Sequence, residues 1–126
     1  MDLVVSVYKA TEALPSSERF GLTSQVRRAV VSIPSNVAEG HARRSDGAFL
    51  NHVKIALGSQ AELMTQIEVA RRLGYLQDDM ATTIEADIDR TRQMLHGLRR
   101  TLERDQLISG ARASAGMLLA IALIFF

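Results

Sequence analysis

Arginine doublets are the residues of this sequence whose type and spacing best suit binding chemistry. Thirteen of the fifteen basic residues are arginine, and only Lys9 and Lys54 are lysine. Eight of the arginines form the doublets Arg27-Arg28, Arg43-Arg44, Arg71-Arg72 and Arg99-Arg100. A guanidinium group donates paired hydrogen bonds to a carboxylate or a phosphate, which a lysine ammonium does less well. The doublets therefore indicate either phosphate binding or ion pairs with the fourteen acidic residues.

Motifs for catalysis and metal binding are absent from the sequence. The three histidines, His41, His52 and His96, have no second potential ligand three or four residues later, and we expect all three on the solvated surface. The absence of cysteine excludes thiol catalysis, thiolate metal sites and disulfides. No glycine-rich phosphate loop and no Gly-x-Ser-x-Gly motif occurs. We expect a protein that is not an enzyme, with no catalytic residue, no metal site and no cofactor.

Helical periodicity dominates the elements that must position these residues. Apolar residues recur at steps of three and four, which predicts helices near residues 2–13, from Ser17 or Thr23 to Gly40, 46–73 and 79–107. The residues expected to face inward are Leu3, Val7, Ala10 and Leu14; Leu22, Val26, Ala29, Val30, Ile33 and Val37; Phe49, Val53, Ala56, Gln60, Leu63, Ile67, Ala70 and Gly74; and Met80, Ile84, Ile88, Thr91, Leu95, Leu98 and Leu102.

This pattern predicts an all-α fold, an antiparallel up-and-down four-helix bundle. The length of 126 residues fits one domain. We expect the bundle to occupy residues 1–107, the second helix to be kinked at Pro34, and residues 108–126 to form an apolar C-terminal extension.

The extension differs in composition from the rest of the chain. Residues 113–126 carry no charge but are shorter than the roughly 20 apolar residues that a membrane span needs. We expect an apolar helix that the bundle or another subunit covers, and a membrane anchor is the less favoured alternative. The N-terminus lacks the basic region of a secretory signal, so the expected location is the cytoplasm.

Polar residues surround the proline of the second helix. Pro34 has no backbone N–H, and we expect Ser32, Ser35 and Asn36 to bond the carbonyls that it leaves without partners. Glu39 and Gly40 are expected to close this helix.

Residues of the third helix are expected to complete an interhelical polar network. Gly58 and Ser59 offer a small surface where a neighbouring backbone can approach, and Glu62 is placed to receive Arg27 or Arg28. A network of this kind is the favoured interpretation, because buried arginines need carboxylate partners. A ligand site is the alternative.

Several of these segments resemble one bacterial family. The matching segments are Ser17–Gln25, Arg27–Ala29, Ser32–Gly40, Ile55–Ser59, Glu62-Leu63 and Ala70–Leu76. Over about residues 3–104 the chain resembles the bacterial four helix bundle protein family, whose founding members are encoded by intervening sequences inside 23S ribosomal RNA genes. A related branch is similar to the accessory protein of diversity-generating retroelements, which works with a reverse transcriptase and RNA.

The resemblance implies a homo-oligomeric bundle, pentameric in relatives, with nucleic-acid binding proposed for the family and no catalytic residues. The positions that match the family signature, assigned chiefly to structure, are Ser32, Pro34, Asn36, Glu39, Gly40, Gly58, Ser59 and Glu62. Relatives usually begin about a dozen residues earlier, within the first helix, and end soon after the fourth. A shortened first helix would leave part of the bundle uncovered.

The net charge of +1 conceals a local surplus of arginine, because residues 90–112 contain six arginines against Glu103 and Asp105. A ring of subunits repeats each basic cluster. The favoured function is therefore a non-enzymatic, homo-oligomeric RNA- or DNA-binding protein. The candidate phosphate contacts are Arg27, Arg28, Arg43, Arg44, Arg99, Arg100 and Arg104.

Two other functions remain open. A protein-interaction scaffold, or a reverse-transcriptase accessory subunit without nucleic-acid specificity of its own, would use the arginines on carboxylates. The scarcity of aromatic residues for base stacking favours it, since only Tyr8, Phe20, Phe49 and Tyr75 lie outside the extension. A membrane-tethered bundle is the third hypothesis.

Overall fold

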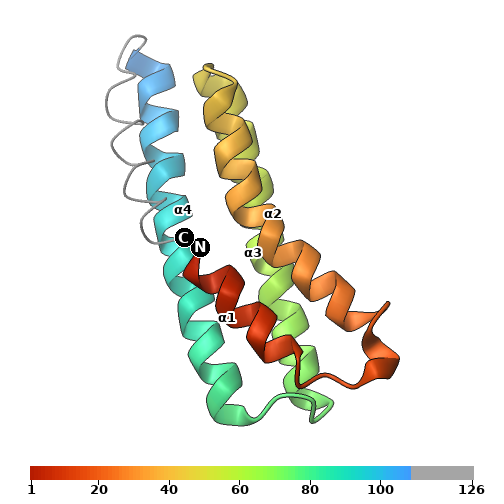
Figure 1. Cartoon of the computed structure of the whole chain (residues 1–126). Coiled ribbons are helices and arrows are strands. Elements are labelled where there is room, and N and C mark those ends of the chain that lie inside the picture. Colours follow the sequence, from red (N-terminus) through yellow and green to blue (C-terminus); the bar gives the residue numbers. More distant parts are fainter. Residues whose placement is uncertain (109–126) are drawn as a thin grey trace.

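Helices account for nearly all of the residues that the structure describes. The structure, a computed structural model, describes residues 1–108. Its elements, in chain order, are α1 (Asp2–Thr11), the short 3-10 helix η1 (Ser16–Glu18), α2 (Leu22–Ala42), α3 (Asp46–Arg72) and α4 (Asp78–Ile108) (Figure 1). No strand occurs within residues 1–108. The predicted all-α class is confirmed over this range.

The helices differ in length and in the neighbours on which they pack. Successive long helices α2, α3 and α4 are antiparallel, with α3 packed on both of the others (Figure 1). The ten-residue α1 packs mainly on α2 and to a lesser extent on α4. Figure 1 shows α1 alongside the half of the bundle that is nearest the turn between α3 and α4. The first half of α2 therefore has α1 beside it, and its second half does not.

The core confirms most of the predicted inward positions. Buried residues at steps of three and four run along all four helices and form one cluster. Two predicted positions are wrong. Gly74 lies in the exposed turn after α3, and Met80 is exposed while its neighbour Ala81 is fully buried. Counting back from Ile84, the inward stripe of α4 takes a step of three to Ala81 instead of a step of four to Met80.

Helix α2 continues through Pro34 and bends near its middle (Figure 1). The polar residues around the proline do not act as expected. The Ser32 hydroxyl lies 2.8 Å from that of Ser59 on α3, and the Asn36 side-chain amide donates to the carbonyl and the hydroxyl of Ser32. The Ser32–Ser59 bond connects α2 to α3, and the bonds from Asn36 to Ser32 lie within α2. None of them reaches the carbonyl that loses its partner to Pro34, which belongs to Val30.

The hydrogen bonds between α2 and α3 form what we call the polar seam, which also includes a histidine that the sequence predicts on the surface. His52 of α3 is half-buried, and its Nδ1 lies 3.0 Å from Oδ1 of Asn36. Because the Asn36 amide nitrogen already donates to Ser32, its oxygen accepts, and Nδ1 of His52 is the donor. Asn36 therefore donates to Ser32 within α2 and accepts from His52 across the interface with α3.

Gly40 also has a different role from the one predicted. It lies inside α2, which ends two residues later at Ala42, and it is buried. A Cβ atom on Gly40 would lie 2.6 Å from Cβ of His52 and 2.9 Å from Cδ2 of Phe49. Glycine here permits close contact between α2 and α3. Gly58, predicted to permit such an approach, is exposed and would have nothing within 4 Å of an added Cβ.

Helix α3 ends in a glycine-dependent turn. The amide of Tyr75 bonds the carbonyl of Ala70 at 2.9 Å, and the amide of Gly74 bonds that of Arg71 at 3.0 Å, with Gly74 at φ +76°. This pair of bonds with a left-handed glycine is the Schellman motif. It reverses the chain so that α4 can return along α3.

Replacing Gly74 by alanine should lower the free energy of unfolding by about 1–2 kcal/mol, because a side chain is strained in the left-handed region. Steric clash adds nothing, since an added Cβ has open space. Urea unfolding followed by circular dichroism measures the change. Gly58→Ala is the control, and it should raise stability by about 1 kcal/mol through helix propensity alone. A stabilised Gly74→Ala variant would contradict the motif's role.

Within residues 1–108, none of the helices combines the length and hydrophobicity of a membrane span. The apolar extension predicted for residues 108–126, with its alternatives of a covered helix or a membrane anchor, lies outside the described residues except for Ile108, the last residue of α4.

Candidate nucleic-acid interface

The seven candidate arginines lie on two separate surfaces. Arg27 and Arg28 are on the first half of α2, beside α1. The other five are at the opposite end of the bundle, where the turn between α2 and α3 meets the end of α4. Gly47 at the start of α3 lies next to Gln106 near the end of α4. A Cβ atom added to Gly47 would lie 3.2 Å from Nε2 of Gln106.

At that distal end, carboxylates accompany most of the arginines. Arg43 pairs with Glu39 at 3.0 Å, Arg99 with Glu103 at 2.9 Å, and Arg104 lies 4.0 Å from the buried Asp105. Arg100 makes no ion pair or hydrogen bond with any residue in 1–108. This surface mixes both signs of charge, as the scaffold hypothesis expects.

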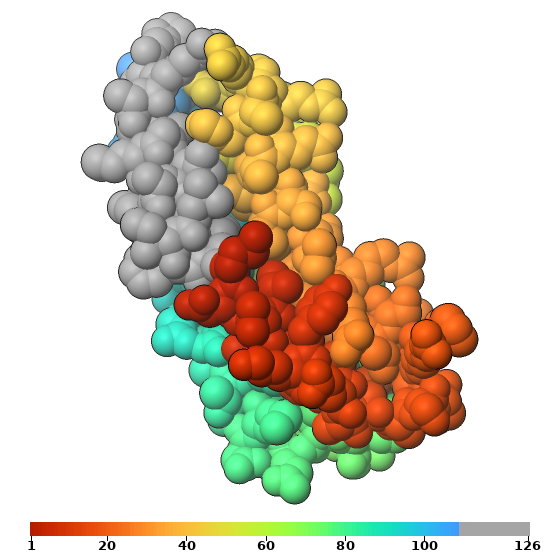
Figure 2. All heavy atoms as spheres, viewed as in Figure 1, coloured from red at the N-terminus to blue at the C-terminus, as the bar shows by residue number. Residues whose placement is uncertain are grey.

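Arg27 and Arg28 belong instead to a concave surface of about 790 Å³, which we call the α1–α2 groove. Its lining residues are Tyr8, Arg19, Phe20, Thr23, Ser24, Arg27, Arg28, Val31 and Ser32. Figure 2 shows α1, in red, seated against the first half of α2, in orange. None of the lining residues is acidic. The groove combines three guanidinium groups, two aromatic rings and the hydroxyls of three serine or threonine residues.

Arg27 is held in place by α1. Its Nε donates to the hydroxyl of Thr11 at 2.9 Å, one Nη donates to the carbonyl of Tyr8 at 3.5 Å, and its guanidinium carbon lies 4.6 Å from the centre of the Tyr8 ring. The expected pair with Glu62 is wrong, because the carboxylate of Glu62 accepts from Gln66 on its own helix. Arg27 therefore fixes Tyr8 as one wall of the groove.

A second cation and ring stand at the start of α2. The guanidinium carbon of Arg19 lies 5.3 Å from the centre of the Phe20 ring, and Phe20 is 89% exposed. Phe20 follows η1 and precedes Gly21, the N-cap residue of α2, so the ring projects from a turn rather than from a helix face. Its exposure means that the ring contributes little to the core.

Arg28 is the cation of the groove that is available for a new partner. It is exposed, and within residues 1–108 it makes no ion pair or hydrogen bond. The carboxylate of Glu18, the last residue of η1, accepts from the amide of Leu22 at 2.8 Å and from the Tyr75 hydroxyl at 3.5 Å. The local charge is thus three guanidinium groups against one carboxylate that is already bonded.

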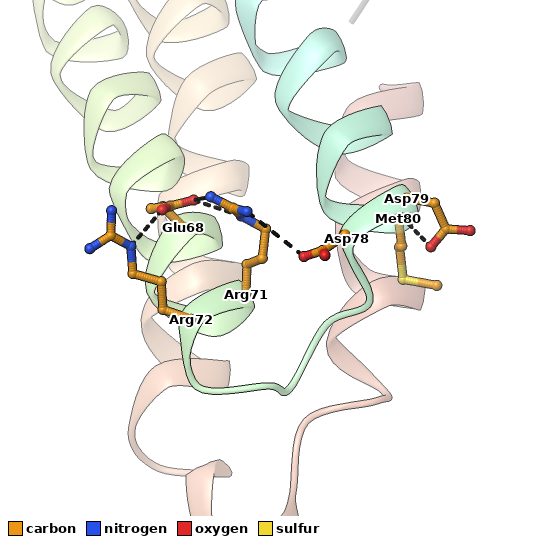
Figure 3. Close-up of polar contacts among 6 residues, drawn as sticks. All are labelled: Glu68, Arg71, Arg72, Asp78, Asp79 and Met80. Atoms are coloured by element: carbon orange, nitrogen blue, oxygen red, sulfur yellow. Dashed lines mark hydrogen bonds and ion pairs between the residues drawn. The ribbon is translucent and has the colours of Figure 1, made fainter.

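The doublet Arg71-Arg72 is bound to carboxylates at the turn between α3 and α4 (Figure 3). Glu68 accepts from Nε of Arg72 at 2.6 Å and from Nε of Arg71 at 2.8 Å, and Arg71 also reaches Asp78 at 3.7 Å. The bonds from Arg72 and Arg71 lower the pKa of Glu68, and the bond to Glu68 raises the pKa of Arg71. This doublet stabilises a turn.

The first half of α4 is similar. Arg90 pairs with Asp87, and Arg92 pairs with Asp89, whose pKa is lowered chiefly by the hydrogen bond from Arg92. Side chains three residues apart on a helix are neighbours, so these pairs form within one element. Neither arginine was a candidate phosphate contact.

The histidines and acidic residues of 1–108 include no group of three or more that could hold a metal ion. His41 is exposed, with its ring edge-on to Phe49 at 5.8 Å, and His96 is half-buried. His52 belongs to the polar seam between α2 and α3, and its bond to Asn36 orients the ring.

Sequence reasoning found two residues of the groove and missed the others. Arg19, Tyr8 and Phe20 were not candidates, although two of the four aromatic residues outside the extension lie here. The dipeptide Arg19-Phe20, a cation beside an aromatic ring in a segment between helices, was the signal available in the sequence.

Two comparisons bear on the identity of the chain. A family model described as 23S rRNA-intervening sequence protein matches residues 1–97. No curated protein matches the chain. The match includes α1, α2, α3 and most of α4, and with them every residue of the groove. The chain therefore belongs to the 23S rRNA-intervening sequence protein family.

Proposed function

We propose that the protein is a non-catalytic nucleic-acid-binding protein that contacts phosphate groups through the α1–α2 groove. The observation that carries this proposal is the composition of the groove, in which Arg19, Arg27 and Arg28 line one concave surface without a carboxylate among the lining residues. Guanidinium groups that are not neutralised by acidic neighbours attract phosphate and bind it with paired hydrogen bonds.

The lining hydroxyls support the same ligand. Thr23 and Ser24 lie in the first turn of α2, beside the three guanidinium groups. Serine and threonine hydroxyls commonly contact the phosphates and sugars of nucleic acids, and such contacts position the backbone without reading sequence. RNA is the first class to test, and DNA offers the same phosphate chemistry.

Assembly would multiply the effect of one groove. A single chain has a net charge of only +1, so its attraction to a polyanion is local. A homo-oligomer, which we propose to be a pentamer by resemblance to relatives, would present one groove per subunit, and linked sites bind far more tightly than separate ones. We propose that this activity takes place in the cytoplasm, with a reverse transcriptase as a candidate partner by the same resemblance.

A protein-interaction scaffold is the second candidate function. The pairs Arg43–Glu39, Arg99–Glu103 and Arg104–Asp105 favour it, because these arginines already have carboxylates nearby and the distal end carries both charges. This function would engage the distal end of the bundle rather than the groove.

Charge reversal at two arginines separates the two functions. Arg28→Glu should weaken binding of a labelled hairpin RNA with a single-stranded extension by about tenfold or more, and should lower the salt dependence of affinity by about one phosphate contact. Arg100→Glu is the matched control, since it changes the charge equally at an arginine that also lacks a partner within residues 1–108. Fluorescence anisotropy between roughly 50 and 200 mM salt measures both effects.

The outcomes have distinct meanings. Unchanged affinity of the wild-type protein between low and physiological salt would overturn the phosphate mechanism. Equal losses in both variants would show that the groove is not the specific binding surface. If Arg100→Glu instead breaks up the assembly in sedimentation, while RNA affinity is unaltered in both variants, the scaffold function is favoured.

A further inference from the structure

We propose that the α1–α2 groove selects single-stranded nucleic acid, because the exposed Phe20 ring and the Tyr8–Arg27 pair provide stacking surfaces for unpaired bases while Arg28 holds the backbone. This inference rests on the proposed function, and it goes further by naming the form of nucleic acid that the site takes. It also assigns a role to aromatic residues that phosphate binding does not need.

The first observation is the exposure of Phe20. A phenylalanine that is 89% exposed contributes almost nothing to the core, and its ring leaves apolar area in water. Only Arg19, at 5.3 Å from the ring centre, approaches it as a cation. Most of the ring is free to accept a planar partner, and every nucleobase has a π-face that can stack there.

The second observation is the matching arrangement on the other wall. Tyr8 is 39% exposed, and the guanidinium of Arg27 lies over its ring, held by Thr11 and by the carbonyl of Tyr8. A guanidinium plane that is fixed in this way offers a further surface on which a base can stack. The hydrogen bonds hold the Arg27 guanidinium beside Tyr8, so Arg27 adds positive charge to the groove, while the exposed Arg28 makes the direct contact with the strand's phosphates.

The shape of the site decides between single and double strands. A duplex keeps its bases stacked inside, so the aromatic faces of a protein cannot reach them without unstacking, which costs a few kcal/mol. The groove is a shallow, open depression of about 790 Å³, and both aromatic residues line it at the surface. Unpaired bases that turn away from the strand can stack on these exposed rings, whereas a duplex would bring only its backbone to them.

The surrounding side chains indicate weak preference among bases. Thr23 and Ser24 can each donate or accept, so they do not impose one pattern on a base edge, and the Ser32 hydroxyl is already bonded to Ser59 and Asn36. Stacking together with phosphate contacts gives binding that tolerates sequence. We therefore expect the distinction to be between strand forms rather than between sequences.

Affinity for three labelled probes tests the inference in the full-length protein: a single-stranded RNA of mixed sequence, a blunt RNA duplex of equal length, and an acidic polyglutamate peptide. The wild-type protein should bind the single strand at least tenfold more tightly than the duplex. Phe20→Ala should reduce affinity for the single strand by about 5- to 150-fold, which corresponds to the 1–3 kcal/mol of one stacked base. It should leave duplex affinity within twofold.

Phe20→Leu is the decisive control variant. It keeps an apolar side chain of similar size at an exposed position but removes the planar ring, so it should lose as much single-strand affinity as Phe20→Ala. Circular dichroism should show both variants folded, because Phe20 is outside the core cluster.

Each contrary result overturns a defined part of the argument. Equal affinity for single strand and duplex, or full affinity in Phe20→Leu, overturns strand selection. Arg28→Glu would still weaken both RNAs in that case, and the proposed function would stand. Binding of polyglutamate as tight as that of the single strand would show recognition by guanidinium charge alone. Absence of binding to either RNA overturns the proposed function together with this inference.

Discussion

Gly40→Ala should lower the free energy of unfolding by about 2 kcal/mol. The added Cβ would lie 2.6 Å from Cβ of His52, a separation that real Cβ atoms do not show. Because that atom is attached directly to the α3 backbone, relief requires the helices to move apart, and overpacking of this kind costs typically 1–3 kcal/mol or more. The gain in helix propensity from glycine to alanine, about 1 kcal/mol, offsets only part of the cost.

Whether Gly40→Ala lowers or raises stability shows whether Gly40 is needed for helix packing or is only a weak helix former. Gly58→Ala makes the same chemical change in the interior of the neighbouring helix, where an added Cβ meets nothing within 4 Å, and it should stabilise the protein. Urea unfolding at equal protein concentration compares the two variants, since concentration affects the stability of any oligomer. A Gly40→Ala protein as stable as the Gly58→Ala protein would show that α2 and α3 do not depend on this contact.

Leu63→Ala should have the largest effect on stability, about 2–5 kcal/mol. Leu63 is fully buried near the middle of α3, the helix that packs on both α2 and α4. Truncation removes apolar contacts and leaves a cavity in the interior, and both terms destabilise the fold. Thermal or urea unfolding monitored by circular dichroism gives the change in free energy.

Val69→Ala is the control on the same helix. Val69 is 41% exposed, and surface substitutions of this kind usually change stability by less than about 0.5 kcal/mol. If Leu63→Ala is no more destabilised than Val69→Ala, the assignment of Leu63 to a shared core between three helices is wrong.

The periodicity of apolar residues was sufficient to predict the helices and most of their buried positions. The expected helices end within a few residues of the observed ones, and the inward stripe of α2 from Val26 to Val37 is buried as expected. The error at Met80 arose because steps of three and four are both helical, so the first turn of α4 could have used either Met80 or Ala81. Packing against neighbouring helices decides which of the two residues faces inward, and the periodicity of the sequence carries no information about that packing.

The candidate site was less accessible to sequence reasoning. Arg27 and Arg28 are adjacent and chemically identical, yet one is bonded to α1 and the other is exposed without a partner among residues 1–108. The difference depends on how α1 lies against α2, which joins residues 16 positions apart. Gly40 and Gly58 show the same limit, because only the approach of α3 to α2 gives the first glycine a steric role.

Helix α1 makes the groove depend on a docking equilibrium, because one wall of the groove is a short helix. A ten-residue helix is marginal in water on its own, so α1 stays helical only while its buried residues Leu3, Val7 and Ala10 remain docked. Only in that docked state does Tyr8 line the groove and does Arg27 bond Thr11 and lie over the Tyr8 ring. A ligand that spans the groove therefore links α1 to α2, and its binding should slow amide hydrogen exchange in α1, which opens locally, more than in α3.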